Sequence, residues 1–211
     1  MPRVDDYVNA AEIGRKALEG ISPERLAEQS GARYRVDSQG EPVLTVAFLG
    51  RDLSVSWPGI TFQQKDSDEE VPIQQQVILL HYLKGAMGSR VTGEWIAYQE
   101  VPDGKFYLDA FQRRAVRPLV QVFGGSPERL TSVAGDLYQA TPVEHGDVGV
   151  RIQALPKVPV VCLLWKGDDE FPPDGTLLFD KGIVDIFSAE DIAWLSGMVV
   201  YPLIGKAKAG G

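Results

Sequence analysis

Apolar and polar positions recur with two different periods along this chain, and the periods divide it into helices and strands. Residues 5–18 place apolar side chains at the three- and four-residue spacing of an amphipathic helix. Residues 34–36, 43–48 and 53–57 alternate or run apolar between turn residues, which is typical of strands. Residues 72–87 are apolar nearly all round, which predicts a helix packed under a sheet or against another helix.

The second half of the chain follows the same succession. Residues 158–165 are apolar on both faces and predict a central strand, whereas residues 176–179 predict a short edge strand. Ser188 and Asp191 form a capping box that begins a final apolar helix. The other expected elements are a strand at 94–98, a long helix from about 106, a short helix at 126–135, a strand at 147–154 and the final helix at 189–204.

One short motif occurs twice. Residues 22–26 and 126–130 both read Ser-Pro-Glu-Arg-Leu, and without a gap Gly31 then aligns with Gly135. In each copy we expect the serine to cap a helix, the proline to occupy its first position and the glycine to end it. A self-match in fixed order predicts a duplicated supersecondary unit.

The expected architecture is therefore α+β, with a mostly antiparallel sheet built from two copies of a helix, short helix, strands and helix. The copies either form one continuous sheet or face each other about a pseudo-two-fold axis, and a ligand held in a groove between them is a hypothesis. The predicted organisation is one globular domain over 1–211, with copy one at 5–90, a connecting hairpin at 91–106, copy two at 107–205 and a flexible tail at 206–211.

Composition narrows the functional classes. A net charge of −8 argues against non-specific nucleic-acid binding, and the cluster of Arg113, Arg114 and Arg117 favours a solvated helix face over a phosphate site. The lone Cys162 excludes an internal disulfide and lies in an apolar run, so we expect a buried small hydrophobe. The first residues show no apolar signal region and no stretch is long enough to span a membrane, which predicts a cytoplasmic protein.

Three adjacent carboxylates, Asp168, Asp169 and Glu170, directly follow the apolar strand at 158–165. With Asp180 from the next strand they could hold a hard cation, although the spacing matches no calcium loop. Alternatively, one carboxylate caps a turn or pairs with Arg114 or Arg151. A solvated or structural role for this run stays open beside the functional one.

His81 lies in an apolar helix, where a satisfied core histidine competes with an axial ligand to haem or a corrinoid. Aromatic residues near the connecting hairpin and the acidic run are typical of a small-molecule pocket, and equally of a core. The cofactor, any catalytic residue and any metal site stay unassigned. The candidate ligand-binding residues are His81, Tyr82, Glu94, Trp95, Tyr107, Arg114, Trp165, Asp168, Asp169, Glu170, Phe171 and Asp180.

Three segments together resemble a known family. They run from Leu79-Leu80-His81-Tyr82-Leu83 to Thr92-Gly93-Glu94-Trp95-Ile96, from Phe106-Tyr107 to Pro118-Leu119, and from Leu155-Pro156 through Leu164-Trp165 and Gly167-Asp168-Asp169-Glu170-Phe171-Pro172 to Leu177-Leu178-Phe179-Asp180. Over roughly residues 20–205 the chain resembles the family of domain of unknown function 3786, from anaerobic bacteria and archaea. The resemblance implies a setting in anaerobic one-carbon or corrinoid metabolism. Some relatives carry an N-terminal four-cysteine iron–sulfur module, but this chain has no cysteine before position 162.

Two functional readings follow. The first is a non-enzymatic binding protein that holds a small molecule or a partner protein, because no phosphate loop, dinucleotide fingerprint or nucleophile elbow occurs. The second is an enzyme or accessory subunit that uses the carboxylates, with a divalent cation. Clustered carboxylates with raised pKa values would favour the enzyme, whereas an exposed acidic loop and a closed core would favour a structural or partner-binding role.

Overall fold

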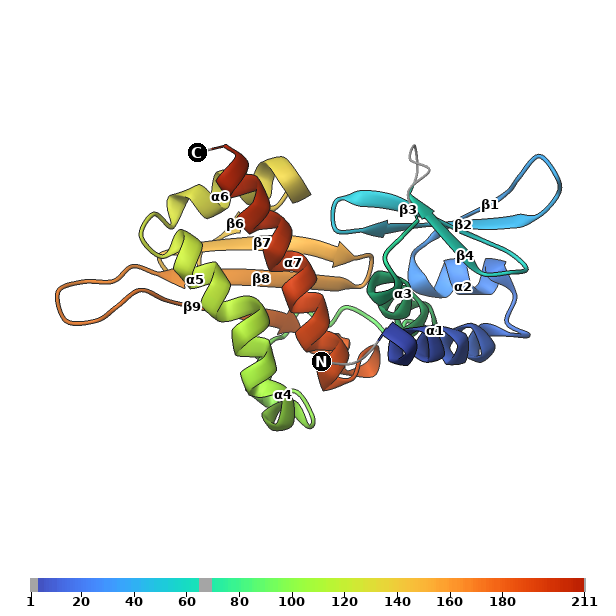
Figure 1. Cartoon of the computed structure of the whole chain (residues 1–211), viewed down its shortest axis with the longest axis horizontal. Coiled ribbons are helices and arrows are strands. Elements are labelled where there is room, and N and C mark those ends of the chain that lie inside the picture. Colours follow the sequence, from blue (N-terminus) through green and yellow to red (C-terminus); the bar gives the residue numbers. More distant parts are fainter. Residues whose placement is uncertain (1–3, 65–69, 211) are drawn as a thin grey trace. The chain divides into compact units, whose positions relative to one another are not determined.

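A computed structural model describes residues 4–64 and 70–210 of the chain and shows an α+β fold with two antiparallel sheets (Figure 1). The chain divides into two compact units. The first contains residues 1–90, 155–157 and 185–187, and the second contains residues 91–154, 158–184 and 188–211. The α+β class and the antiparallel pairing predicted from the sequence are confirmed.

The first unit combines three helices with a four-stranded antiparallel meander in the order β1-β2-β3-β4. Helices α1 and α3 pack against each other, and α2 contacts β1 and β2. The elements are α1 (Val4–Leu18), α2 (Pro23–Ser30), β1 (Arg33–Val36), β2 (Pro42–Phe48), β3 (Arg51–Ser56), β4 (Thr61–Gln64) and α3 (Ile73–Gly85).

Local sequence explains the boundaries of these elements. Ser22 caps α2 as predicted, because its Oγ accepts a hydrogen bond from the Arg25 N–H at 3.2 Å. Gly31 then ends the helix in the left-handed conformation, at φ 73°. Alternation along β2 buries Leu44, Val46 and Phe48 completely. Strand β4 was not predicted, because Thr61-Phe62-Gln63-Gln64 offers one apolar side chain in a short polar run.

The second unit contains a five-stranded antiparallel sheet and its helices. A helix of about twenty residues is interrupted by the π-helical turn η2. The elements are β5 (Trp95–Ala97), η1 (Tyr98–Glu100), α4 (Gly104–Phe111), η2 (Gln112–Val116), α5 (Arg117–Phe123), α6 (Glu128–Tyr138), β6 (Thr141–Val143), β7 (Val148–Leu155), β8 (Val158–Trp165), β9 (Asp174–Asp180), η3 (Lys181–Asp185) and α7 (Ala189–Ala209).

The strand order β5-β9-β8-β7-β6 confirms one prediction and corrects two. Strand β8 is central, as its two apolar faces predicted. Strand β9 is not an edge strand, because β5 pairs with it on the side opposite to β8. For the same reason residues 91–106 form no hairpin of their own, and their one strand joins a partner more than eighty residues away.

Three helix predictions also need correction. Gly135 does not end α6, which continues to Tyr138 and closes at Gln139 in the left-handed conformation. No side-chain cap begins α6, so Ser126 does not repeat the role of Ser22. The predicted flexible tail from residue 206 is instead helical to Ala209, because alanine and lysine favour helix and Arg129 donates a hydrogen bond to the Ala207 carbonyl at 3.0 Å.

The order of elements is similar in the two halves of the chain. Helices α1 and α2, strands β1 to β4 and helix α3 follow one another in the first unit. In the second unit the interrupted helix α4–α5, then α6, then strands β6 to β9 and finally α7 do the same. This order is what a duplication requires, and the duplication itself stays a prediction.

Both apolar helices and the lone cysteine lie where the hydrophobic pattern placed them. Leu79, Leu80 and Leu83 of α3 are completely buried, and Cys162 in β8 is a buried free thiol whose burial raises its pKa to about 12. Within the ranges 4–64 and 70–210, no helix combines the length and the apolarity that crossing a bilayer requires.

Candidate functional site

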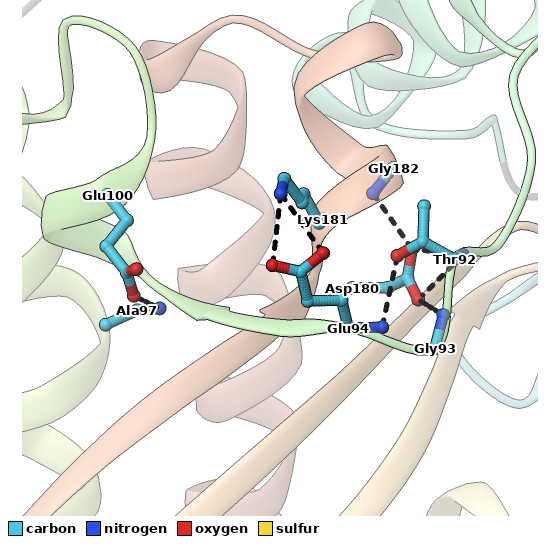
Figure 2. Close-up of polar contacts among 8 residues, drawn as sticks. All are labelled: Thr92, Gly93, Glu94, Ala97, Glu100, Asp180, Lys181 and Gly182. Carbon is cyan, nitrogen blue, oxygen red and sulfur yellow. Dashed lines mark hydrogen bonds and ion pairs between the residues drawn. The ribbon is translucent and has the colours of Figure 1, made fainter.

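One end of β9 carries a carboxylate clamp, which we define as Asp180 with Thr92, Gly93 and Gly182. Figure 2 shows the Asp180 carboxylate accepting hydrogen bonds from the N–H groups of Thr92 and Gly93, at 2.9 and 2.6 Å. The Thr92 hydroxyl donates a further bond at 3.1 Å and the Gly182 N–H one at 2.9 Å. Asp180 is only 1% exposed, so the second unit holds a buried, fully hydrogen-bonded carboxylate.

The local sequence explains why these donors converge. Gly93 adopts the left-handed conformation, at φ 78°, which lets the chain turn directly after the two N–H groups that bond to Asp180. Burial raises the pKa of Asp180, but the hydrogen bonds from Thr92, Gly182 and Gly93 together outweigh burial and lower it. The carboxylate therefore stays ionised and its oxygens are occupied. This is the arrangement of a structural anchor, and not of a group that exchanges protons.

The residues around the clamp also pair with one another. The Lys181 ammonium contacts both carboxylate oxygens of Glu94, at 3.0 and 3.1 Å, and the Lys181 N–H donates to the Glu94 carbonyl at 2.8 Å. Trp95 lies opposite Asp180 in the β5–β9 ladder. Glu100 accepts a hydrogen bond from the Ala97 N–H at 2.7 Å (Figure 2). Three of the predicted site residues, Glu94, Trp95 and Asp180, are thus brought together.

The opposite end of β9 carries the acidic hairpin loop, which we define as residues 165–174. Asp168 organises this loop: its Oδ1 accepts hydrogen bonds from the N–H groups of Glu170 and Phe171 at 2.8 and 2.7 Å, and its own N–H donates to the Phe171 carbonyl at 2.9 Å. These bonds, first that from Phe171 and then that from Glu170, lower the pKa of the Asp168 carboxyl. The hypothesis that one carboxylate of the run caps a turn is confirmed.

The acidic hairpin loop exposes two aromatic side chains. Phe171 is 67% exposed and Trp165 is 39% exposed, although large apolar residues usually lie inside. Asp169 and Glu170 are exposed beside them. In Figure 1 the loop extends beyond the strands of its own sheet. Trp165 is therefore not a core residue, and the loop presents aromatic and acidic groups on the same segment.

The structure does not assemble the four-carboxylate group suggested by the sequence. Trp165 pairs with Asp174 where β8 meets the loop, whereas Asp180 lies six residues further along β9. Six residues of strand span about 20 Å. Among residues 4–64 and 70–210, no group of three or more histidine, cysteine, aspartate or glutamate side chains could hold a metal ion. The same separation divides the predicted aromatic cluster, since Trp95 lies at the Asp180 end.

Tyr107 and Arg114 come together around the buried Tyr98. The Tyr98 hydroxyl donates to the Ala189 carbonyl at 2.8 Å. The pKa of Tyr98 is raised to about 12, chiefly by burial and then by the nearby Tyr107, whereas Arg114 acts to lower it. The Arg114 guanidinium lies over the Trp194 ring, with Cζ 4.1 Å from its centroid. Tyr107 and Arg114 are therefore neighbours of one structural tyrosine.

Arg114 lies in η2, and the neighbouring proline explains that π-helical turn. Pro118 has no N–H to donate to the carbonyl four residues earlier, and its ring would clash there, so the helix widens locally. Arg113 and Arg117 remain exposed and both pair with Asp109. The predicted solvated helix face therefore describes Arg113 and Arg117, whereas Arg114 folds onto Trp194.

His81 and Tyr82 lie in α3 of the first unit. The buried Tyr82 hydroxyl donates to the Ser30 carbonyl at 2.5 Å and accepts from the Lys157 N–H at 3.1 Å, and burial raises its pKa. Tyr82 thus connects α2, α3 and residues 155–157. His81 is half-buried, and its role as an axial ligand stays a prediction.

Several contacts of the clamp and of Arg114 are not predictable from local sequence. Thr92 and Gly93 were recognised as part of a motif, but their partner Asp180 is more than eighty residues away and no local signal connects them. Gly182 follows Asp180 closely, and this Asp-x-Gly spacing is a usable signal. Trp194 lies in the apolar helix α7, and its contact with Arg114 has no signal in the local sequence.

Comparison with known proteins identifies the family and no individual relative. No curated protein and no solved structure matches the chain significantly. The family model described as domain of unknown function DUF3786 matches residues 22–201, a range that contains α2, α3, both sheets, the carboxylate clamp and the acidic hairpin loop. The chain therefore belongs to the DUF3786 family.

Proposed function

We propose that this chain is a non-enzymatic binding protein that docks a partner protein through its acidic hairpin loop. The observation that carries the proposal is Phe171, which is 67% exposed on a loop whose backbone is held by its own hydrogen bonds. A large aromatic side chain loses hydrophobic stabilisation when water surrounds it. Binding to an apolar pocket on a partner would recover that loss.

The geometry of the loop lowers the entropic cost of such binding. Asp168 fixes the turn with three hydrogen bonds. Gly167 lets the chain close on itself, since a Cβ there would lie 2.6 Å from Pro173 Cδ and 2.9 Å from the Phe171 carbonyl oxygen. A loop ordered before binding loses less conformational freedom when it docks, and aromatic anchors dominate many interface energies.

The charge of the loop indicates the chemistry of the partner. Asp169, Glu170 and Asp174 are exposed, and Asp168 stays ionised. The single lysine of the loop, Lys166, pairs with Glu128. This contact lowers the pKa of Glu128 and raises the pKa of Lys166, so both groups stay charged. The loop is therefore negative in sum. We infer a partner surface with an apolar pocket and a basic rim, because complementary charge speeds and orients association.

The enzymatic reading has less support. A general acid or base needs a pKa near the working pH, but the pKa of Asp168 and that of Asp180 are both lowered. Cys162 is completely buried and its pKa of about 12 opposes a thiolate. Small-molecule binding, a cytoplasmic location, the absence of a nucleic-acid partner and the one-carbon or corrinoid setting stay predictions.

The test compares two exposed phenylalanines by quantitative affinity enrichment from an extract of the source cells. The bait is the full chain as wild type, Phe171→Ser or Phe106→Ser; Phe106 is 72% exposed and serves as the matched control. We expect a partner that wild type and Phe106→Ser enrich equally and that Phe171→Ser loses at least tenfold. A partner retained by Phe171→Ser, or lost equally by both variants, would overturn the docking role.

A further inference from the structure

The first unit has an open sheet edge at β1. Within residues 4–64 and 70–210, the order β1-β2-β3-β4 leaves one side of β1 without a neighbouring strand. All four residues of β1 are exposed, including the apolar Tyr34 and Val36 at 37% and 51%. An unpaired edge presents a row of backbone donors and acceptors on which another extended segment can pair.

Two hydrogen bonds establish which backbone groups of β1 face outward. The Asp37 N–H donates to the Glu41 carbonyl at 2.9 Å, and the Trp57 N–H to the Pro42 carbonyl at 3.0 Å. Antiparallel partners alternate between bonded and non-bonded pairs. In the register of β1 with β2, Arg33 and Arg35 therefore bond to β2, whereas Tyr34 and Val36 point their N–H and C=O groups away from the sheet.

Each of the other three edges of the two sheets carries a local feature that hinders pairing at one position. β4 is followed by a bridge from Gln63 to Glu70. β6 contains Pro142, which has no N–H to offer. On β5 the Ala97 N–H is taken by the Glu100 carboxylate (Figure 2). In the part of the chain that the structure describes, β1 carries no such protection on its backbone.

Charge decides what can pair with this edge. Arg33 and Arg35 project from one face of β1, and Tyr34 and Val36 from the other, because side chains alternate along a strand. A second copy paired antiparallel about Arg35 would oppose two Arg35 side chains. One paired about Tyr34 would oppose Arg35 and Arg33, although Arg33 already pairs with Asp52 at 2.6 Å. Like charges directly opposite each other destabilise a strand pair. A partner strand with carboxylates at these positions is favoured instead.

We propose that the outer edge of β1 binds an extended acidic segment of a partner protein by strand addition. The segment places acidic side chains beside Arg33 and Arg35 and apolar side chains beside Tyr34 and Val36. Main-chain hydrogen bonds to Tyr34 and Val36 supply affinity. Arg35 supplies most of the selectivity, because the Arg33 guanidinium already pairs with Asp52. This inference rests on the first unit and is independent of the docking role of the acidic hairpin loop.

The experiment titrates the full chain with a synthetic octapeptide in which glutamate and valine alternate. Amide hydrogen exchange at Tyr34 and Val36 is the primary measurement, and an octapeptide of alternating lysine and valine is the control. We expect the glutamate peptide to slow exchange at these two amides at least tenfold and the lysine peptide to leave it unchanged. Unchanged exchange at millimolar glutamate peptide would overturn the proposal.

Two variants connect the binding to the edge. Val36→Pro removes an outward N–H and keeps the bonds to β2, so we expect an unchanged melting temperature and at least about tenfold weaker peptide binding. Arg35→Glu should reverse the preference from the glutamate peptide to the lysine peptide. Peptide binding that survives Val36→Pro, an unchanged preference in Arg35→Glu, or self-association of the chain through β1 would each contradict an acidic partner.

Discussion

Replacing Asp180 by asparagine tests the role of the carboxylate clamp. The side chain keeps its size, but one acceptor oxygen becomes an NH₂ group that can only donate. The two oxygens of Asp180 accept from the N–H groups of Thr92, Gly93 and Gly182 and from the Thr92 hydroxyl. In Asp180→Asn, at least one of these buried N–H groups therefore faces another donor.

The size of the effect follows from the burial and the charge of Asp180. The carboxylate is 1% exposed, so water cannot replace the lost acceptor. Hydrogen bonds to a charged group contribute about 1.5–3 kcal/mol, and an unsatisfied buried donor adds a penalty of similar size. Because these terms overlap, we expect Asp180→Asn to lower the free energy of unfolding by about 2–4 kcal/mol. For a chain of this length that corresponds to a fall of roughly 4–16 °C in melting temperature.

The pH dependence provides a second, independent signature. The pKa of Asp180 is lowered in the folded protein, so its stabilisation is complete above the unfolded pKa of about 3.9. This stabilisation disappears as the pH falls through the lower, folded pKa. Asparagine does not titrate. The difference in stability between wild type and Asp180→Asn should therefore be constant from pH 7 to about pH 5 and shrink below about pH 4.

Urea unfolding followed by circular dichroism at pH 7, 5 and 3.5 measures both effects. Glu94→Gln is the control, because it removes an ion pair whose side chains are 61% and 53% exposed. Such an exposed pair contributes about 0–1 kcal/mol. An Asp180→Asn variant as stable as Glu94→Gln at pH 7, or a deficit that does not shrink in acid, would refute the clamp as a source of stability.

Two backbone positions give further predictions. A Cβ at Gly85 would lie 2.3 Å from the Ile186 carbonyl oxygen, so Gly85→Ala should lower the melting temperature by roughly 2–12 °C. Gly205→Ala is the control, because a Cβ there meets no atom within 4 Å, and it should leave the melting temperature equal or higher. A Gly85→Ala variant as stable as wild type would contradict the close approach. Leu49 adopts a left-handed conformation, at φ 49°, in the turn before Gly50, and this conformation strains a leucine backbone. Leu49→Asn should therefore raise the free energy of unfolding by about 0.5–1 kcal/mol, because asparagine tolerates this conformation. A lower melting temperature of Leu49→Asn would contradict the strain.

Local chemistry made much of the fold predictable. The Ser22 cap, the Ser188–Asp191 capping box and the central position of β8 depend on neighbouring residues or on hydrophobic pattern, and all three are confirmed. Gly135 does not end α6, because the buried side chains of Leu130 and Tyr138 form one apolar face that continues past Gly135. The sequence predicts an edge position for β9, because no residue near β9 indicates its pairing with the distant strand β5.

The candidate site was less predictable because its parts meet through the register of strands. Asp180 is close in sequence to the acidic hairpin loop, and that proximity suggests a common site. In the structure, six residues of extended strand separate Asp180 from Asp174, so the two lie at opposite ends of β9. Most of the donors that hold Asp180 come from residues 92–93, in the loop before β5. The turn formed by Asp168 was foreseeable, since aspartate often bonds to N–H groups two or three residues ahead.

Site-specific photo-crosslinking in the source cells tests the docking role most directly. A photoreactive phenylalanine analogue replaces Phe171 in one strain and Phe106 in another, since both side chains are exposed. The account predicts one discrete protein adduct from position 171 that is absent from position 106 and that an excess of unlabelled wild-type chain suppresses. No adduct at position 171, or the same adducts from both positions, would contradict it.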